Sequence, residues 1–174
     1  MEKVLKNKKG FTLIELLAVI VILAILVMVA IPAVTRYLNS ARQGTYADNA
    51  LAAISAVRND VIMNGFAPDD GQTSEPYKYT YDKDEINGLL EKKLNTSPFG
   101  GTYTTAEIVV VQIEKTKTVG GTTTGTGEYE YLYQMCLVDD GGHGFDYTFE
   151  KNIEAKAVKM TGAACNSNNI KTSE

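Results

Sequence analysis

The chain has 174 residues, enough for one folded domain with an appended segment and too few for two domains of ordinary size. Its formal charge is −4, but Lys3, Lys6, Lys8 and Lys9 outweigh Glu2 in the first ten residues, and taking this +3 away leaves −7 for the remainder. An acidic remainder argues against nucleic-acid binding through a basic surface, so no nucleic-acid partner is expected.

A long apolar run follows the basic start. Leu16 to Val34 is a stretch of nineteen residues without a charge, which is long enough to span a bilayer as a helix. The four lysines precede this run and none follows it directly, so the positive-inside rule places residues 1–10 in the cytoplasm and the body of the chain outside.

The far end of the run does not look like a signal-peptide cleavage site. A secretory signal has an apolar core of roughly 7–15 residues followed by small residues at the cut. Here the core is longer, and it ends in Val29-Ala30-Ile31-Pro32-Ala33 without an Ala-x-Ala pair. Removal of the run by a signal peptidase is therefore not expected.

The near end of the run carries a specific motif. In KKGFTLIELL, Gly10 and Phe11 follow the lysines, and Glu15 is the only charge in the apolar stretch that begins at Phe11. This segment resembles the cleavage and methylation motif of type IV prepilins. The resemblance implies that a prepilin peptidase, which is also a methyltransferase, cuts after Gly10 and methylates the new amine of Phe11. It divides the N-terminal part into a cleaved leader, 1–10, and a transmembrane or assembly helix, 11–34.

Glu15 needs compensation because a carboxylate inside a bilayer costs roughly 2.5–3.5 kcal/mol on insertion scales. The resemblance implies that the Phe11 ammonium of one mature subunit pairs with Glu15 of its neighbour, so that burial of both charges sets the axial register of a filament. The alternative is that Glu15 lies near the membrane edge and extends to water without a further role.

Helical periodicity continues past the membrane segment. Ala50, Leu51, Ile54, Val57 and Val61 recur at spacings of three and four, which predicts an amphipathic half, residues 35–64, of one helix over 11–64.

Two residues weaken this predicted helix. Pro32 removes a backbone hydrogen bond and Gly44 raises backbone entropy. The resemblance makes Pro32 an assembly residue, because pilins commonly carry a helix-kinking proline there. The alternative is a proline that the membrane helix tolerates, without a role in assembly.

The globular head is expected over 65–174. The sequence predicts a connection over residues 65–82, a short helix over 83–94, and a turn from Pro98 to Gly101. Period-two alternation then predicts antiparallel strands. These strands are Glu107 to Lys115, Glu128 to Val138, a short one through Phe145, Tyr147 and Phe149, and Ile153 to Met160, with VGGTTTGTG as a flexible hairpin loop. The fold class is therefore α+β, a long N-terminal helix packed on an antiparallel sheet, which resembles the pilin fold.

Two stripes of tyrosines occur at strand spacing in the head. They are Tyr77, Tyr79 and Tyr81, and Tyr129, Tyr131 and Tyr133. Such rings mostly pack across a sheet face, with adhesion as the alternative role.

The two cysteines, Cys136 and Cys165, can form a disulfide in an exported domain. Such a bridge would fix the C-terminal tail to the sheet, as a C-terminal disulfide does in many pilins. The alternative is that one of them stays a buried thiol, because the Cys136 face also carries Leu132 and Val138.

Asp139, Asp140 and Asp146 surround a Gly-Gly-His-Gly segment. They could offer oxygen ligands to calcium, but Asp and Gly are also the residues that such turns require. His143 is the only histidine, and it has no nucleophile partner at a recognisable spacing. No catalytic residue, metal site or cofactor is expected, and the chain is not expected to be an enzyme.

These observations predict a structural protein. The resemblance implies a pilin that polymerises with itself or with other pilins, through the inner-membrane pilus assembly machinery, into an extracellular filament for adhesion, twitching motility or colonisation. The alternatives are a minor pilin, a pseudopilin or a competence-type pilin of a secretion or DNA-uptake system. A third interpretation, a membrane-anchored enzyme or receptor that keeps residues 1–34 as an anchor, predicts no cleavage.

Overall fold

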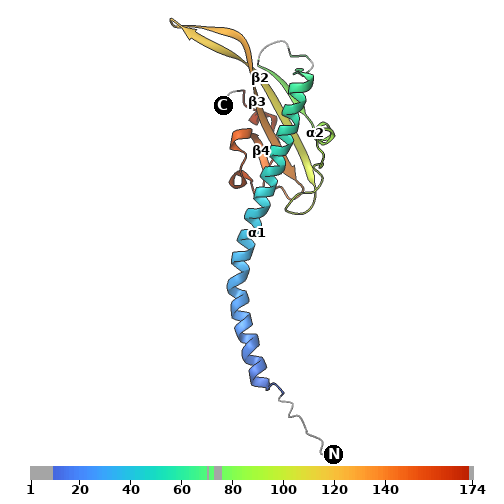
Figure 1. The fold of residues 1–174 in the computed structure, drawn as a ribbon, viewed down its shortest axis with the longest axis vertical. Coiled ribbons are helices and arrows are strands. Elements are labelled where there is room, and N and C mark those ends of the chain that lie inside the picture. The colour runs from blue at the N-terminus through green and yellow to red at the C-terminus, as the bar shows by residue number, and fades with distance from the viewer. Residues whose placement is uncertain (1–9, 70, 73–75, 173–174) are drawn as a thin grey trace, which may run out of the picture. The chain divides into compact units, whose positions relative to one another are not determined.

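The computed structural model describes residues 10–69, 71–72 and 76–172 (Figure 1). The predicted basic leader therefore lies outside the described residues except for Gly10. The chain divides into two compact units, Met1–Asn39 and Ser40–Glu174, and each is described by itself. The elements in chain order are α1 Leu13–Asn64, β1 Tyr77–Tyr81, α2 Lys83–Leu89, β2 Tyr103–Val119, β3 Thr122–Asp139 and β4 Gly144–Phe149, followed by the short 3-10 turns Glu150–Asn152, Ala155–Ala157 and Ser167–Asn169.

In the first unit, the described part consists of three non-helical residues and the first half of α1. The helix begins at Leu13, two residues later than predicted, and continues through Pro32. Every residue from Gly10 to Leu38 is exposed. Since these side chains are almost all apolar, this half of α1 presents a continuous hydrophobic surface without a buried stripe.

The second unit is built on a four-stranded antiparallel sheet in the order β1-β2-β3-β4 (Figure 1). The second half of α1 covers one face of it, and this confirms the predicted fold class. The buried positions of α1 recur at spacings of one, three and four, which gives the stripe expected of an amphipathic helix. They are Tyr46, Ala47, Ala50, Ala53, Ile54, Val57 and Val61.

The helix meets the sheet through apolar packing and one buried hydroxyl. Ile54 and Val57 share a core with Ile108 and Met135 of the sheet. The Tyr46 hydroxyl lies 3.2 Å and 3.0 Å from the carbonyl oxygens of Leu137 and His143. A buried hydroxyl costs free energy unless it is hydrogen-bonded, so this contact fixes where the helix lies along β3.

The close spacing of β3 and β4 depends on a glycine. Gly144 has a φ of 151°, and a Cβ at this position would lie 1.9 Å from the Leu137 carbonyl oxygen. A side chain would therefore push the two strands apart at the point where Val138 pairs with Gly144.

The opposite face of the sheet is covered by the C-terminal tail. A second, smaller cluster contains Val109, Val111 and Cys136 from the strands, with Ala163 buried and Ile170 partly buried from the tail. The sheet is therefore enclosed between α1 and the tail, which explains why β2 has buried side chains on both of its faces.

Two predicted boundaries before the sheet need correction. The segment 65–82 was predicted as a connection, but Tyr77–Tyr81 pairs with Ile108–Gln112 and forms β1. The helix predicted over 83–94 ends at Leu89, because Leu90 adopts an extended backbone. An Asp82 to Glu85 capping box fixes the start of α2, as such boxes do.

The segment VGGTTTGTG, residues 119–127, is a paired hairpin with a two-residue turn and not a flexible loop. Val119 pairs with Thr122, and the ladder continues through Thr116 and Gly125. Gly120 and Gly121 both have positive φ, 60° and 82°, as the tight two-residue turns of hairpins require. The Gly and Thr content predicted a flexible loop, but the β-branched threonines suit a strand once the tight turn sets the register.

The segment Ile153 to Met160, predicted as strand, is also different. It contains the 3-10 turn Ala155–Ala157 and one isolated bridge between Lys159 and Gly144. Ile153 and Val158 are buried. The apolar residues of this segment therefore mark the two places where an irregular chain packs on the core, and they do not mark a strand.

The tyrosine stripes pack mainly against neighbouring side chains. The rings of Tyr79 and Tyr81 lie 4.7 Å apart between centroids. Tyr131 lies 5.5 Å from Phe66, and the Arg58 guanidinium lies 4.9 Å from the Tyr133 ring. These contacts support the packing interpretation for four of the six rings.

Candidate functional site

The first feature with chemical interest is the junction before α1. Gly10 and Phe11 lie in non-helical, exposed backbone, and the Phe11 side chain is 93% exposed. Proteases cleave most readily at exposed chain outside secondary structure. The peptide bond between these two residues is thus accessible, and helix α1 begins two residues after Phe11.

The start of α1 is a capping box that the sequence analysis missed. Thr12 is the residue before the helix, and its amide and hydroxyl donate to Glu15 Oε2 at 2.8 and 2.9 Å. In return, the Glu15 amide donates to the Thr12 hydroxyl at 3.3 Å. The signal was present as Thr-x-x-Glu in TLIE, the pattern of a capping box.

The capping box determines where the Glu15 carboxylate points. It is turned back towards residue 12 and sits at the N-terminal end of the helix, where the macrodipole favours a negative charge. The carboxylate is therefore held beside the backbone of Thr12, one residue from the Phe11 nitrogen. Thr12 is a residue that positions Glu15.

The apolar run after Glu15 can cross a membrane by its length and composition. Its polar interruptions are few. Pro32 lies inside the helix and cannot donate a backbone hydrogen bond to the Met28 carbonyl. Three residues further on, the Thr35 hydroxyl donates to the Ile31 carbonyl at 2.9 Å, so this side chain bonds back to its own helix.

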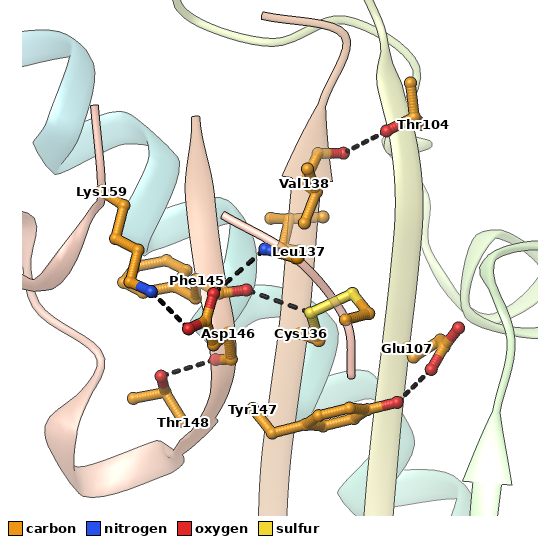
Figure 2. The surroundings of a disulfide bond; sticks show 12 residues. Thr104, Glu107, Cys136, Leu137, Val138, Phe145, Asp146, Tyr147, Thr148 and Lys159 are labelled. Atoms are coloured by element: carbon orange, nitrogen blue, oxygen red, sulfur yellow. Dashed lines mark hydrogen bonds and ion pairs between the residues drawn. A yellow bond between two sulfur atoms is a disulfide. The ribbon is translucent and has the colours of Figure 1, made fainter. Parts of the chain in front are cut away.

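The second feature is the disulfide between Cys136 and Cys165, with Cα atoms 5.6 Å apart (Figure 2). Cys136 is completely buried in β3, on the face away from α1. Its Sγ lies 3.1 Å from the Phe145 carbonyl oxygen; because a disulfide sulfur carries no hydrogen, this is a packing contact. The bond joins the tail to the centre of the sheet.

Polar contacts hold the part of the tail just before Cys165. The Asp146 carboxylate accepts a hydrogen bond from the Ala164 amide at 3.0 Å and pairs with the Lys159 ammonium (Figure 2). Burial alone would raise the pKa of the Asp146 carboxyl, but the Lys159 ammonium and the Ala164 amide stabilise its charged form, so its pKa lies below the ordinary value.

The three aspartates considered as calcium ligands have separate structural partners. Asp139 is buried and accepts hydrogen bonds from the amides of Gly141 and His143 and from the Ser97 hydroxyl. Asp140 accepts from the Thr102 amide at 3.0 Å. Within the described residues, no three or more His, Cys, Asp or Glu side chains gather to hold a metal ion.

His143 belongs to the same turn. Its Nδ1 lies 3.0 Å from Asp139, and its ring stacks on Phe99 with centroids 4.3 Å apart. The Ser97 hydroxyl bonds to Asp139 at 2.6 Å, so in this cluster the carboxylate lies between the hydroxyl and the imidazole. This differs from a nucleophilic triad, in which the imidazole takes the proton of the hydroxyl.

A known family model matches the N-terminal part of the chain. The prokaryotic N-terminal methylation motif matches residues 5–31, which include the Gly10 to Phe11 junction, Glu15 and most of the apolar run. No curated protein and no solved structure matches the chain. The motif is the substrate signal for prepilin peptidase in pilin-type proteins, and in this chain it precedes a long helix packed on an antiparallel sheet. The chain is therefore a type IV pilin-like prepilin.

Proposed function

We propose that this chain is the precursor of a structural subunit of a type IV pilus. In this proposal the peptidase removes residues 1–10 and methylates the Phe11 amine. The mature chain begins with the assembly helix 11–34, continues with the amphipathic half 35–64, and carries the head 65–174 on the outside of the cell.

One observation carries the proposal: the matched motif coincides with an accessible junction. The Gly10 to Phe11 bond is exposed and non-helical, and a Cβ added at Gly10 would meet no atom within 4 Å. Packing of the described residues therefore does not require glycine at this position. A peptidase pocket that admits only a small residue does require it.

Glu15 is proposed to act in assembly. After cleavage the new ammonium of Phe11 is adjacent to Thr12, whose amide and hydroxyl already bind the Glu15 carboxylate. The capping box thus presents the carboxylate at the N-terminal tip of the helix, where the ammonium of a neighbouring subunit can pair with it. In a low-dielectric filament core such a pair replaces two isolated charges.

Pro32 is proposed to let the helix adjust during packing. It removes one hydrogen bond of α1, and Gly44 lowers the helix propensity further along. The helix is continuous through both residues in the structure. Local opening at Pro32 during assembly would therefore be a change from the described state.

The proposed partners follow from this sequence of events. Before assembly they are the cytoplasmic membrane, the peptidase and the inner-membrane assembly machinery, and afterwards they are further copies of this chain or other pilins. The proposed place of the mature protein is a filament at the cell surface that serves adhesion, motility or colonisation.

The processing step is tested by comparing two valine variants in the producing cell. Gly10→Val should remain unprocessed, with Met1 at its N-terminus. Gly44→Val is the matched control, because a Cβ at Gly44 also meets no atom within 4 Å, and it should be processed like the unmodified chain. Cleavage of Gly10→Val at the same bond would contradict the proposal.

The amount of filament separates the pilin from the pseudopilin. A major pilin should be abundant in filaments sheared from the cells. A pseudopilin should be processed in the same way but be absent from that fraction.

A further inference from the structure

The outer parts of β2 and β3 form a projection that we call the arm, residues 113–130. β1 pairs with β2 only as far as Gln112, and β4 pairs with β3 only from Gln134 onward. Beyond these rungs the two strands pair only with each other among the described residues, and they extend past the rest of the sheet (Figure 1).

Such a ribbon is poorly stabilised by itself. An isolated two-stranded hairpin is marginal in water, and its free edges can accept another chain. From Lys115 to Gly127 every side chain is exposed, and Val119 near the tip is 67% exposed. The arm therefore has more to gain from packing on a partner than any buried strand of the head.

The distal half of the arm is cationic. Residues 115–127 contain Lys115, Lys117 and no acidic residue, whereas the whole unit from Ser40 onward carries 12 basic and 19 acidic residues, a charge of −7. Lys115 lies 3.6 Å from Glu128. Lys117 forms no ion pair with any described residue. It lies five residues beyond Gln112, about 17 Å at 3.3–3.4 Å per residue.

An acidic pocket with aromatic walls lies elsewhere on the same head, at the C-terminal end of α1 beside β1 and α2. Its volume is about 370 Å³, and its lining includes Asp60, Tyr79, Tyr81 and Glu85. None of the lining residues belongs to the arm.

The carboxylates of this pocket suit a cation. Asp60 accepts a hydrogen bond from the Tyr81 hydroxyl at 2.8 Å, and Glu85 accepts one from the Tyr79 hydroxyl at 2.6 Å. Neither carboxylate pairs with a cation among the described residues. Carboxylates beside tyrosine rings offer both charge-assisted hydrogen bonds and cation-π attraction to an ammonium group.

We infer that the arm of one copy docks on a second copy of this chain, with the Lys117 ammonium in the pocket formed by Asp60, Glu85 and the two tyrosines. The inference rests on the proposed function, because it needs copies held side by side. Arm and pocket are different surfaces, so the contact is head-to-tail. Contacts of this kind do not close as symmetric dimers, and they propagate into an open helical filament when the rotation between copies does not close a ring.

Zero-length carbodiimide cross-linking of sheared filaments tests the contact on the unmodified protein. The reagent joins a lysine amine to a carboxylate in direct contact. The expected result is a covalent dimer in which Lys117 is linked to Asp60 or Glu85. Lys117→Arg keeps the charge but removes the reactive amine, so it should assemble normally and lose this link.

Charge reversal gives a second readout. Lys117→Glu should reduce the amount of sheared filament several-fold, whereas Lys92→Glu, a change at an exposed lysine outside arm and pocket, should leave it unchanged. Filaments that begin at Phe11 but lack the Lys117 link, or that are linked arm to arm, would overturn this inference and leave the proposed function intact. Absence of the chain from filaments would overturn both.

Discussion

The side-chain amide of Gln134 exchanges two hydrogen bonds with the backbone of Lys171. Its Nε2 donates to the Lys171 carbonyl, and its Oε1 accepts from the Lys171 amide at 2.9 Å. Gln134 is completely buried in β3, so its side chain supplies the tail with the two hydrogen bonds that a neighbouring strand would otherwise make.

We predict that Gln134→Ala lowers the free energy of unfolding by about 2 kcal/mol or more, because two hydrogen bonds of about 1 kcal/mol each are lost in a buried place. Urea unfolding of the mature chain in detergent, followed by tyrosine fluorescence, measures the change. Gln112→Ala is the control. Gln112 is only half-buried, and among the described residues its side chain has one hydrogen bond, to the Tyr131 hydroxyl. A loss as large as that of Gln134→Ala would therefore contradict the prediction.

The disulfide should account for much of the stability of the head. Replacing Cys136 and Cys165 together by alanine opens a loop with a sequence separation of 29, for which chain entropy predicts a loss of about 3–4 kcal/mol. The same urea measurement, with thiol labelling before and after reduction, tests this. Equal stability of the oxidised and reduced chains would show that the bridge does not constrain the tail.

The contact between Asp146 and Lys159 should make the free energy of unfolding depend on pH. The pKa of Asp146 in the folded chain is below its ordinary value. The ionised carboxylate therefore contributes fully to the free energy of unfolding at pH values above the pKa of the unfolded chain, about 3.9. This contribution is lost as the pH falls through the lower, folded value.

Asp146→Asn should therefore be less stable than the unmodified chain at pH 7, and the difference should close below about pH 4. Unfolding measured at both pH values tests the sign. Asp48→Asn, which changes an exposed acid on α1, is the matched control for the loss of a surface carboxylate at pH 7. A difference for Asp146→Asn that grows on acidification would contradict the assignment.

Assembly should depend on Glu15 separately from processing. Glu15→Ala should still be cut after Gly10, but the amount of sheared filament should fall roughly tenfold or more, the factor that corresponds to about 1.4 kcal/mol in the contact between subunits. Asp48→Ala removes another exposed acid of the same helix and should assemble normally. Filaments of Glu15→Ala in normal amount would show that the carboxylate serves only the helix start.

Local patterns predicted much of the fold. The apolar run and the spacing from Ala50 to Val61 predicted α1 to within two residues of each end, because helix periodicity is long and regular there. Alternation likewise located the inner parts of β2 and β3. These features depend on residues close in sequence.

The remaining features depend on contacts between distant residues. The threonine-rich segment 119–127 becomes strand only because it pairs with β2. Residues 153–160 stay irregular because only one of them, Lys159, forms a bridge to another residue, Gly144, among the described residues. The pocket around Asp60 and Glu85 is lined by residues of α1, β1 and α2, so no single sequence motif predicts it. The capping role of Thr12 was predictable from its spacing to Glu15. It was missed because these residues also belong to the cleavage motif, which explained Glu15 in another way.

The N-terminal residue of this chain in filaments sheared from the producing cell is the most direct test of the central claim. Our account predicts a chain that begins with N-methylated Phe11, followed by Thr12. A chain that begins at Met1 and stays in the membrane fraction would contradict it. Residues 1–34 would then be a plain anchor for the head.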